Sequence, residues 1–117
     1  MTPAHVEAEK NIKNVMGDSE KVFEYGSLQD ATVQLEVLGR ITVNIPDTLK
    51  GYARSHIEVE GVVYPLIIPQ AEGVIHGSVA EVSAEELQKL DAYETMAYKR
   101  KNVLLESGIY AWVYIAA

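Results

Sequence analysis

Apolar and polar residues alternate along much of the chain, and this alternation predicts several short strands. Pro65 interrupts one of the apolar runs, which predicts an edge strand or an irregular strand there. Residues 33–38 fit either a strand or a short helix running from Asp30 to Gly39. Gly51 predicts a bend or a close backbone approach. The predicted strands cover residues 21–25, 49–59, 62–68, 74–82, 101–106 and 110–115, the last two forming a hairpin.

One segment has helical instead of strand periodicity. Residues 83–94 begin with the S-x-x-E signature of a capping box, formed by Ser83 and Glu86, and Leu87 and Leu90 mark the apolar stripe. Many strands around this one long helix predict an α+β domain, a small barrel or a strongly curled sheet.

Glu94 stands on the apolar side of this helix, where a leucine would be expected. It lies about 20° from Leu87 and about 40° from Leu90 around the helix axis. Burial of a carboxylate is costly and raises its pKa, and a carboxyl group with a raised pKa suits a general base or acid near neutral pH. The alternative is a helix that ends at Tyr93, with Glu94 in solvent or paired with Arg100. Taken on this segment alone, that structural alternative is the more common outcome.

The first strand ends in a Tyr25-Gly26-Ser27-Leu28 turn. Glycine tolerates backbone torsions that other residues avoid, so the N–H groups that follow could converge on an anion, such as a substrate carboxylate or a developing oxyanion. An ordinary turn is the more common alternative. Ser27 lacks the G-x-S-x-G context of a nucleophilic serine.

Composition restricts the classes of function. The chain has 117 residues, 48% hydrophobic residues, a net charge of −7 and no cysteine. The size indicates a single domain over residues 21–117, preceded by an extension over residues 1–20 with a helix at 2–17. The acidic charge argues against nucleic-acid and anionic-membrane partners, and the three histidines lack metal-ligand spacing. We therefore expect no metal and no cofactor, and a cytoplasmic location.

Several short motifs occur in one order: Tyr25-Gly-Ser-Leu28, Gly77, Leu90-Asp-Ala-Tyr-Glu94, Tyr98-Lys-Arg100 and Ala111-Trp-Val-Tyr114. In this order the chain resembles the gamma-glutamylcyclotransferase-like family, which includes gamma-glutamylamine cyclotransferases, over about residues 21–117. The resemblance implies a small mixed β-barrel with flanking helices, and a helix near residues 31–38. It also implies that Glu94 is the proton-transfer glutamate and that Tyr25, Gly26, Ser27 and Leu28 form the substrate-binding loop.

Three features depart from the family pattern. Gln29 stands where many members have a basic residue, Thr95 follows the glutamate where glycine is frequent, and the first 20 residues are additional. These departures bear on the substrate more than on the chemistry.

The resemblance implies cyclisation of a gamma-glutamyl amine or amide to 5-oxoproline, with release of the amine and Glu94 as general base and acid. The expected partner is a small-molecule substrate. One alternative is a non-catalytic domain that keeps the cavity and binds a small molecule. Another is a homodimeric interaction protein that uses the 2–17 helix.

Overall fold

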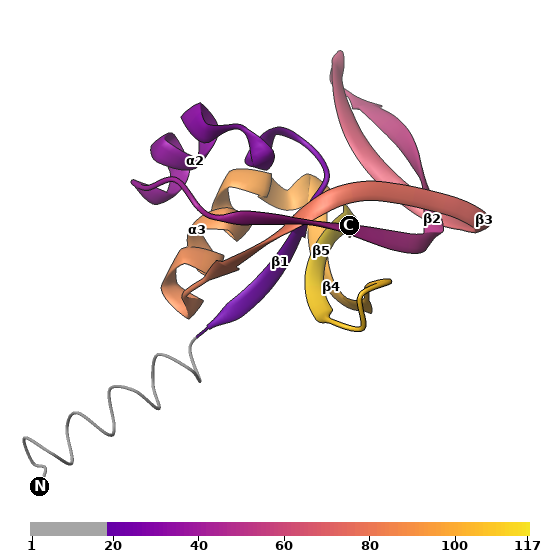
Figure 1. Cartoon of the computed structure of the whole chain (residues 1–117). Helices are drawn as coiled ribbons and strands as arrows, with labels where there is room; N and C mark the ends of the chain where they lie inside the picture. Colours follow the sequence, from indigo (N-terminus) through magenta and orange to yellow (C-terminus); the bar gives the residue numbers. More distant parts are fainter. Residues whose placement is uncertain (1–18) are drawn as a thin grey trace, which may run out of the picture.

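The computed structural model describes residues 19–117, so the helix predicted at 2–17 lies outside the described residues (Figure 1). Five strands form one curled, half-barrel sheet in the order β2-β3-β1-β5-β4. β1 pairs antiparallel with β3 and parallel with β5, so the sheet is mixed. The fold is therefore the α+β type that the sequence predicted. The elements are β1 Glu20–Glu24, η1 Ser27–Gln29, α2 Ala31–Leu38, β2 Asn44–Val59, β3 Val62–Val82, α3 Ala84–Glu94, η2 Thr95–Ala97, β4 Tyr98–Leu104 and β5 Tyr110–Ala116.

The segment from 62 to 82 is one continuous strand, so the prediction of two separate strands was wrong. Pro65 is tolerated because this half of β3 pairs only with β2 and leaves its other edge free. The register shifts between Lys50 and Tyr52, where Gly51 has a φ of +90°. A Cβ on Gly73 would lie 2.1 Å from the carbonyl oxygen of Tyr52, so both glycines allow the bend. The long hairpin therefore turns back on itself (Figure 1).

Residues 31–38 form a helix, in agreement with the resemblance. The Asp30 side chain accepts a hydrogen bond from the Thr32 N–H at 2.7 Å, and this contact caps the start of α2. Gly39 ends α2 with a φ of +77°, a left-handed conformation that suits glycine. The two caps therefore select the helix, although the apolar alternation also fitted a strand.

The capping box at the start of α3 is present as predicted, with the Ser83 side chain and Glu86 each satisfying a backbone N–H. Leu87 and Leu90 are buried in a cluster that includes Val22 of β1, whereas the adjacent Phe23 belongs to a second cluster. Successive residues of β1 therefore point to opposite faces of the sheet and enter different cores.

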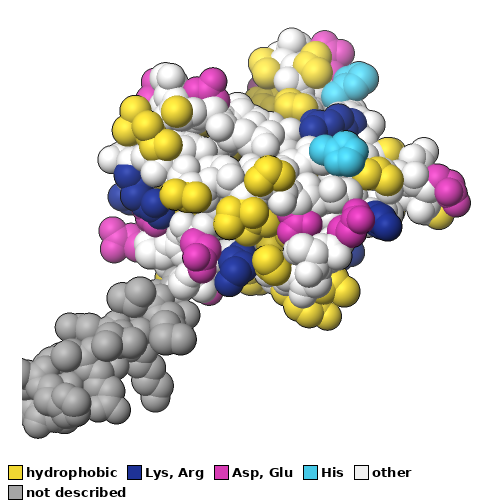
Figure 2. Space-filling model, viewed as in Figure 1, with side chains coloured by type: hydrophobic (Ala, Val, Ile, Leu, Met, Phe, Trp, Pro, Cys, Tyr) yellow, Lys and Arg dark blue, Asp and Glu magenta, His cyan; other side chains and the backbone are white. Residues whose placement is uncertain are grey.

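Acidic and basic side chains are interspersed on the face shown in Figure 2, and the basic ones form no continuous patch there. Within residues 19–117, no helix is long and apolar enough to cross a membrane.

Candidate active site

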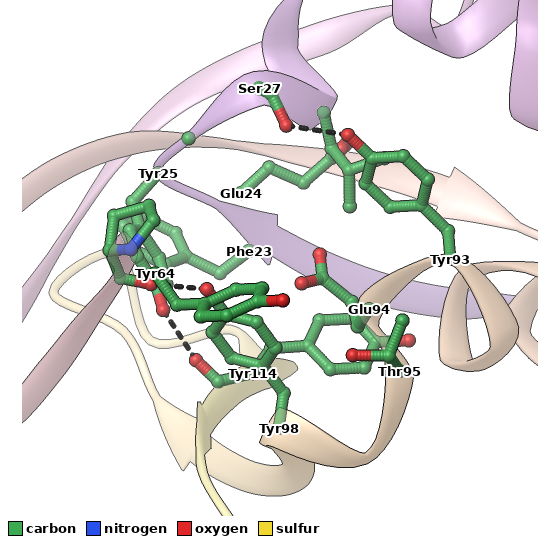
Figure 3. A pocket seen from close by; sticks show the side chains of 13 residues that line it. Phe23, Glu24, Tyr25, Ser27, Tyr64, Tyr93, Glu94, Thr95, Tyr98 and Tyr114 are labelled. Carbon is green, nitrogen blue, oxygen red and sulfur yellow. Dashed lines mark hydrogen bonds between the residues drawn. The ribbon is translucent and has the colours of Figure 1, made fainter. Parts of the chain in front are cut away.

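A cavity of about 300 Å³ opens where the end of β1, the end of α3 and the returning β2–β3 hairpin meet (Figure 3). Its walls combine two glutamates with five tyrosines, and none of the lysines, arginines and histidines within residues 19–117 lines it. The lining residues are Phe23, Glu24, Tyr25, Gly26, Ser27, Leu28, Tyr64, Pro65, Tyr93, Glu94, Thr95, Tyr98 and Tyr114. The structure thus brings Glu94 and the whole Tyr25–Leu28 turn to one hollow.

Glu94 is the last residue of α3, and its half-buried carboxyl group points into the cavity (Figure 3). Burial raises its pKa from 4.5 to about 7. The alternative of an ion pair with Arg100 is wrong, because the Arg100 Nε donates to Asp91 at 2.7 Å instead. Asp91 also accepts from the Tyr114 hydroxyl at 2.7 Å, which makes Asp91 and Arg100 structural supports beside the cavity. Glu94 is left as a carboxyl group that can change its protonation state near neutral pH.

The Tyr25–Leu28 turn faces Glu94 across the cavity. In the described part of the chain, the N–H groups of Gly26, Ser27 and Leu28 have no acceptor among the hydrogen bonds of the turn. The Ser27 hydroxyl lies 2.9 Å from the Tyr93 hydroxyl and so connects the turn to the last turn of α3. These unpaired N–H groups can receive an anionic or carbonyl oxygen of a ligand.

Gly26 turns the chain at the end of β1 without a left-handed backbone. Its φ is −134°, and an added Cβ would meet no atom within 4 Å. The absence of a side chain at Gly26 therefore keeps space open beside the cavity.

Gly77, by contrast, stands where the chain is tightly packed. A Cβ at this position would lie 2.4 Å from the Glu24 carbonyl oxygen and 2.8 Å from the Phe23 ring. The glycine therefore lets β3 approach the end of β1 and fixes the floor of the site.

Glu24 is a second acidic residue in the cavity, and reasoning from the sequence did not select it. Its side chain is 5% exposed. Burial raises its pKa from 4.5 to about 8, opposed by a hydrogen bond from Asn44 and reinforced by the charge of Glu94. The available signal was its position two residues after Val22 in β1, because alternate residues of a strand share a face.

Gln29, where the family often has a basic residue, does not line the cavity. Its side-chain oxygen accepts from the Ser78 hydroxyl at 3.0 Å, and Ser78 in turn accepts from Asn44 at 3.0 Å. This polar chain leads back to Glu24, because the same Asn44 amide also donates to it. Gln29 therefore supports the site from behind.

Five tyrosines line the cavity, and hydrogen bonds and ring contacts fix several of them in place. The Tyr98 hydroxyl donates to the Pro65 carbonyl oxygen and ties the returning hairpin to the start of β4. The rings of Tyr64 and Tyr98 meet edge to face, with centroids 6.4 Å apart. The Tyr25 hydroxyl donates to the Tyr114 carbonyl oxygen at 2.6 Å. These contacts hold the aromatic walls in place.

Thr95 follows Glu94 directly and has a φ of +67° and a ψ of −172°. A β-branched residue rarely adopts this conformation, which glycine adopts freely. The departure at Thr95 therefore places a strained residue at the point where α3 ends and the carboxyl group enters the cavity.

Residues 22–117 match the family model described as "Gamma-glutamyl cyclotransferase, AIG2-like". The chain belongs to this family. AIG2-like protein A of Arabidopsis thaliana is 40% identical over 83 residues, which are 70% of this chain and 49% of the relative. AIG2-like protein C of the same plant is 36% identical over 83 residues, 70% of this chain and 47% of the relative. The chain thus spans about half the length of these curated relatives.

Solved structures share this fold. A solution structure from Arabidopsis thaliana has a TM-score of 0.73 at 32% identity, covering 85% of this chain and 69% of the other. A structure titled "Gamma-glutamyl cyclotransferase" has a TM-score of 0.69 at 15% identity, covering 85% and 67%. At that lower identity the likeness concerns the fold alone.

Within residues 19–117, no three histidine, aspartate or glutamate side chains are grouped as metal ligands.

Proposed function

We propose that this protein cyclises a gamma-glutamyl amine or amide to 5-oxoproline and releases the amine, with Glu94 as the proton-transfer residue. The observation that carries the proposal is a partly dehydrated carboxyl group, with a pKa of about 7, opposite a turn with unpaired N–H groups. Membership of the gamma-glutamyl cyclotransferase, AIG2-like family supports the reaction type.

The substrate supplies its own nucleophile in this reaction. Its α-nitrogen attacks the γ-carbonyl carbon, a C–N bond closes the five-membered lactam, and the original amide C–N bond breaks. Holding the two groups together makes the attack effectively unimolecular, which can lower the barrier by several kcal/mol. The cavity therefore has to orient the substrate and move protons.

The proton balance defines the role of Glu94. The α-ammonium group starts with three protons and the lactam nitrogen keeps one, so two protons must reach the leaving amine, which departs as an ammonium ion. Glu94 carries these two protons one at a time: as a carboxylate it accepts a proton from the α-nitrogen, returns it to the leaving nitrogen, and then repeats the transfer with the second proton. A pKa of about 7 allows both transfers near neutral pH.

The turn supplies the complementary contacts. The N–H groups of Gly26, Ser27 and Leu28 can bind the α-carboxylate or the oxygen of the reacting carbonyl, where negative charge develops. The volume of about 300 Å³ lies at the lower end for small-molecule sites, which fits one gamma-glutamyl group with a small amine.

The test is an assay for 5-oxoproline with purified protein and a panel of gamma-glutamyl amines and peptides. We expect the wild type to form 5-oxoproline from at least one substrate and Glu94→Gln to lose that activity at an unchanged melting temperature. Glu85→Gln, an exposed substitution on the same helix, is the matched control and should keep the activity. A ligand-induced rise in melting temperature without product on any substrate would reject the enzyme and favour the non-catalytic binding domain.

A further inference from the structure

Glu24 is an enclosed carboxyl group that has no cationic partner within residues 19–117. Its side chain is 5% exposed, and Oε1 accepts one hydrogen bond, from the Asn44 amide at 3.3 Å. Among residues 19–117, no other side chain donates to this carboxyl group, and no lysine or arginine pairs with it. A buried carboxylate without a cation is unfavourable, so the group is either neutral or needs a cation from a ligand.

The surroundings of Glu24 favour a cationic ligand. Glu94 reaches the same cavity from α3, and the remaining titratable groups that line it are tyrosine hydroxyls (Figure 3). Tyrosine rings attract ammonium groups through their faces. Arg54 contacts this segment, but it donates to the carbonyl oxygens of Tyr25 and His76 and does not line the cavity. In the part of the chain that the structure describes, the cavity thus combines two acidic groups and aromatic walls with no basic side chain.

We propose that Glu24 is a specificity-determining residue that selects gamma-glutamyl amides whose leaving amine carries a second ammonium group, as in a diamine. This assignment rests on the proposed function. Glu94 serves the α-ammonium group, and Glu24 pairs with the ammonium group at the far end of the leaving amine. A leaving group with a carboxylate at that position is repelled, and no basic side chain among the described cavity residues compensates for it.

Binding of an ammonium group to Glu24 also changes the protonation state of its carboxyl group. Burial raises the pKa of Glu24 to about 8, so the free carboxyl group is mostly protonated at pH 7. Binding of an ammonium group favours the carboxylate, and the displaced proton is released to the solvent. Diamine binding should therefore release protons near neutral pH.

Three probes with the same four-carbon chain test the assignment: 1,4-diaminobutane, butylamine and 4-aminobutanoate. The diamine carries two positive charges, butylamine carries one positive charge, and 4-aminobutanoate carries one positive and one negative charge. Calorimetric titration at about pH 7 should show that the wild type binds the diamine at least about tenfold more tightly than butylamine, because a charge-assisted hydrogen bond is added. 4-Aminobutanoate should bind most weakly.

Glu24→Gln keeps the size of the side chain and should reduce the preference for the diamine to within about twofold, whereas Glu58→Gln, an exposed substitution in β2, should keep it. A second measurement compares the wild type with Glu24→Gln: titrations in two buffers of different ionisation enthalpy give the number of protons released, and the wild type should release more, because Glu94 alone remains to lose a proton in the variant. Undetectable diamine binding, equal affinity for diamine and butylamine, an unchanged preference in Glu24→Gln, or proton release no greater in the wild type than in Glu24→Gln would each overturn the assignment.

Turnover distinguishes this proposal from the proposed function. None of the three probes contains a gamma-glutamyl group, so their binding does not depend on the reaction. Formation of 5-oxoproline without a diamine preference would reject the role of Glu24 alone. A diamine preference without 5-oxoproline from any gamma-glutamyl substrate would reject the reaction and leave the binding site standing.

Discussion

Replacing Glu24 by glutamine should stabilise the protein at alkaline pH and leave its stability almost unchanged at acid pH. Burial raises the pKa of Glu24 from 4.5 to about 8, so the folded state favours the protonated form more than the unfolded chain does. Its contribution to stability is fully present below pH 4.5 and is lost as the pH rises towards 8. Glutamine resembles the protonated form and keeps the contact with Asn44, so the variant avoids this loss.

The size of the effect follows from the two pKa values. One pKa unit corresponds to about 1.4 kcal/mol, so the difference between 4.5 and about 8 sets a ceiling of about 5 kcal/mol. The difference in the free energy of unfolding between variant and wild type should be near zero at about pH 4.5 and approach this ceiling above about pH 8. The side chain is 5% exposed, so solvent screening reduces the value little.

Urea unfolding of both proteins at about pH 5 and about pH 8.5 measures this difference. Glu58→Gln is the control, because its exposed position predicts a change within about 0.5 kcal/mol at both pH values. A stabilisation by Glu24→Gln that is the same at both pH values would refute the reasoning, and so would a variant less stable than the wild type at about pH 8.5.

Two further predictions concern backbone positions around the site. Thr95→Gly should stabilise the protein by about 1 kcal/mol in thermal unfolding, because it relieves the φ of +67°; an unchanged or lower melting temperature would contradict the strain. Gly77→Ala should destabilise by about 3 kcal/mol or prevent folding, because its Cβ would lie 2.4 Å from the Glu24 carbonyl oxygen. Gly26→Ala is the matched control for Gly77→Ala in urea unfolding, since its Cβ meets no atom within 4 Å; equal losses in the two variants would exclude the close contact as the cause.

Local sequence signals predicted the helix whose start is marked by a capping box. The capping box of Ser83 and Glu86 and the Leu87–Leu90 spacing predicted α3, which placed Glu94 on the core side. The alternation over residues 33–38 left strand and helix open, because the decisive contacts are the caps at Asp30 and Gly39. The continuity of β3 through Pro65 depends on which edge of the sheet is free, and a local pattern does not contain that information.

The site was only partly predictable for a similar reason. A polar residue on the apolar side of a helix is visible in the sequence, so Glu94 was found. Glu24 follows Val22 at strand spacing, but its burial results from α3 and from residues such as Asn44 that are distant in the chain. The strain at Thr95 arises from the path of the chain between α3 and β4, and only the φ value reveals it. Side chains brought together by tertiary contacts therefore needed the structure.

The most direct test of the central claim is the pH dependence of kcat/KM for 5-oxoproline formation. If Glu94 accepts the proton as a carboxylate, activity should rise with pH and reach half of its maximum near pH 7, because burial raises the Glu94 pKa to about 7. Activity that stays constant between about pH 5 and about pH 8 would contradict a proton-transfer role for this carboxyl group.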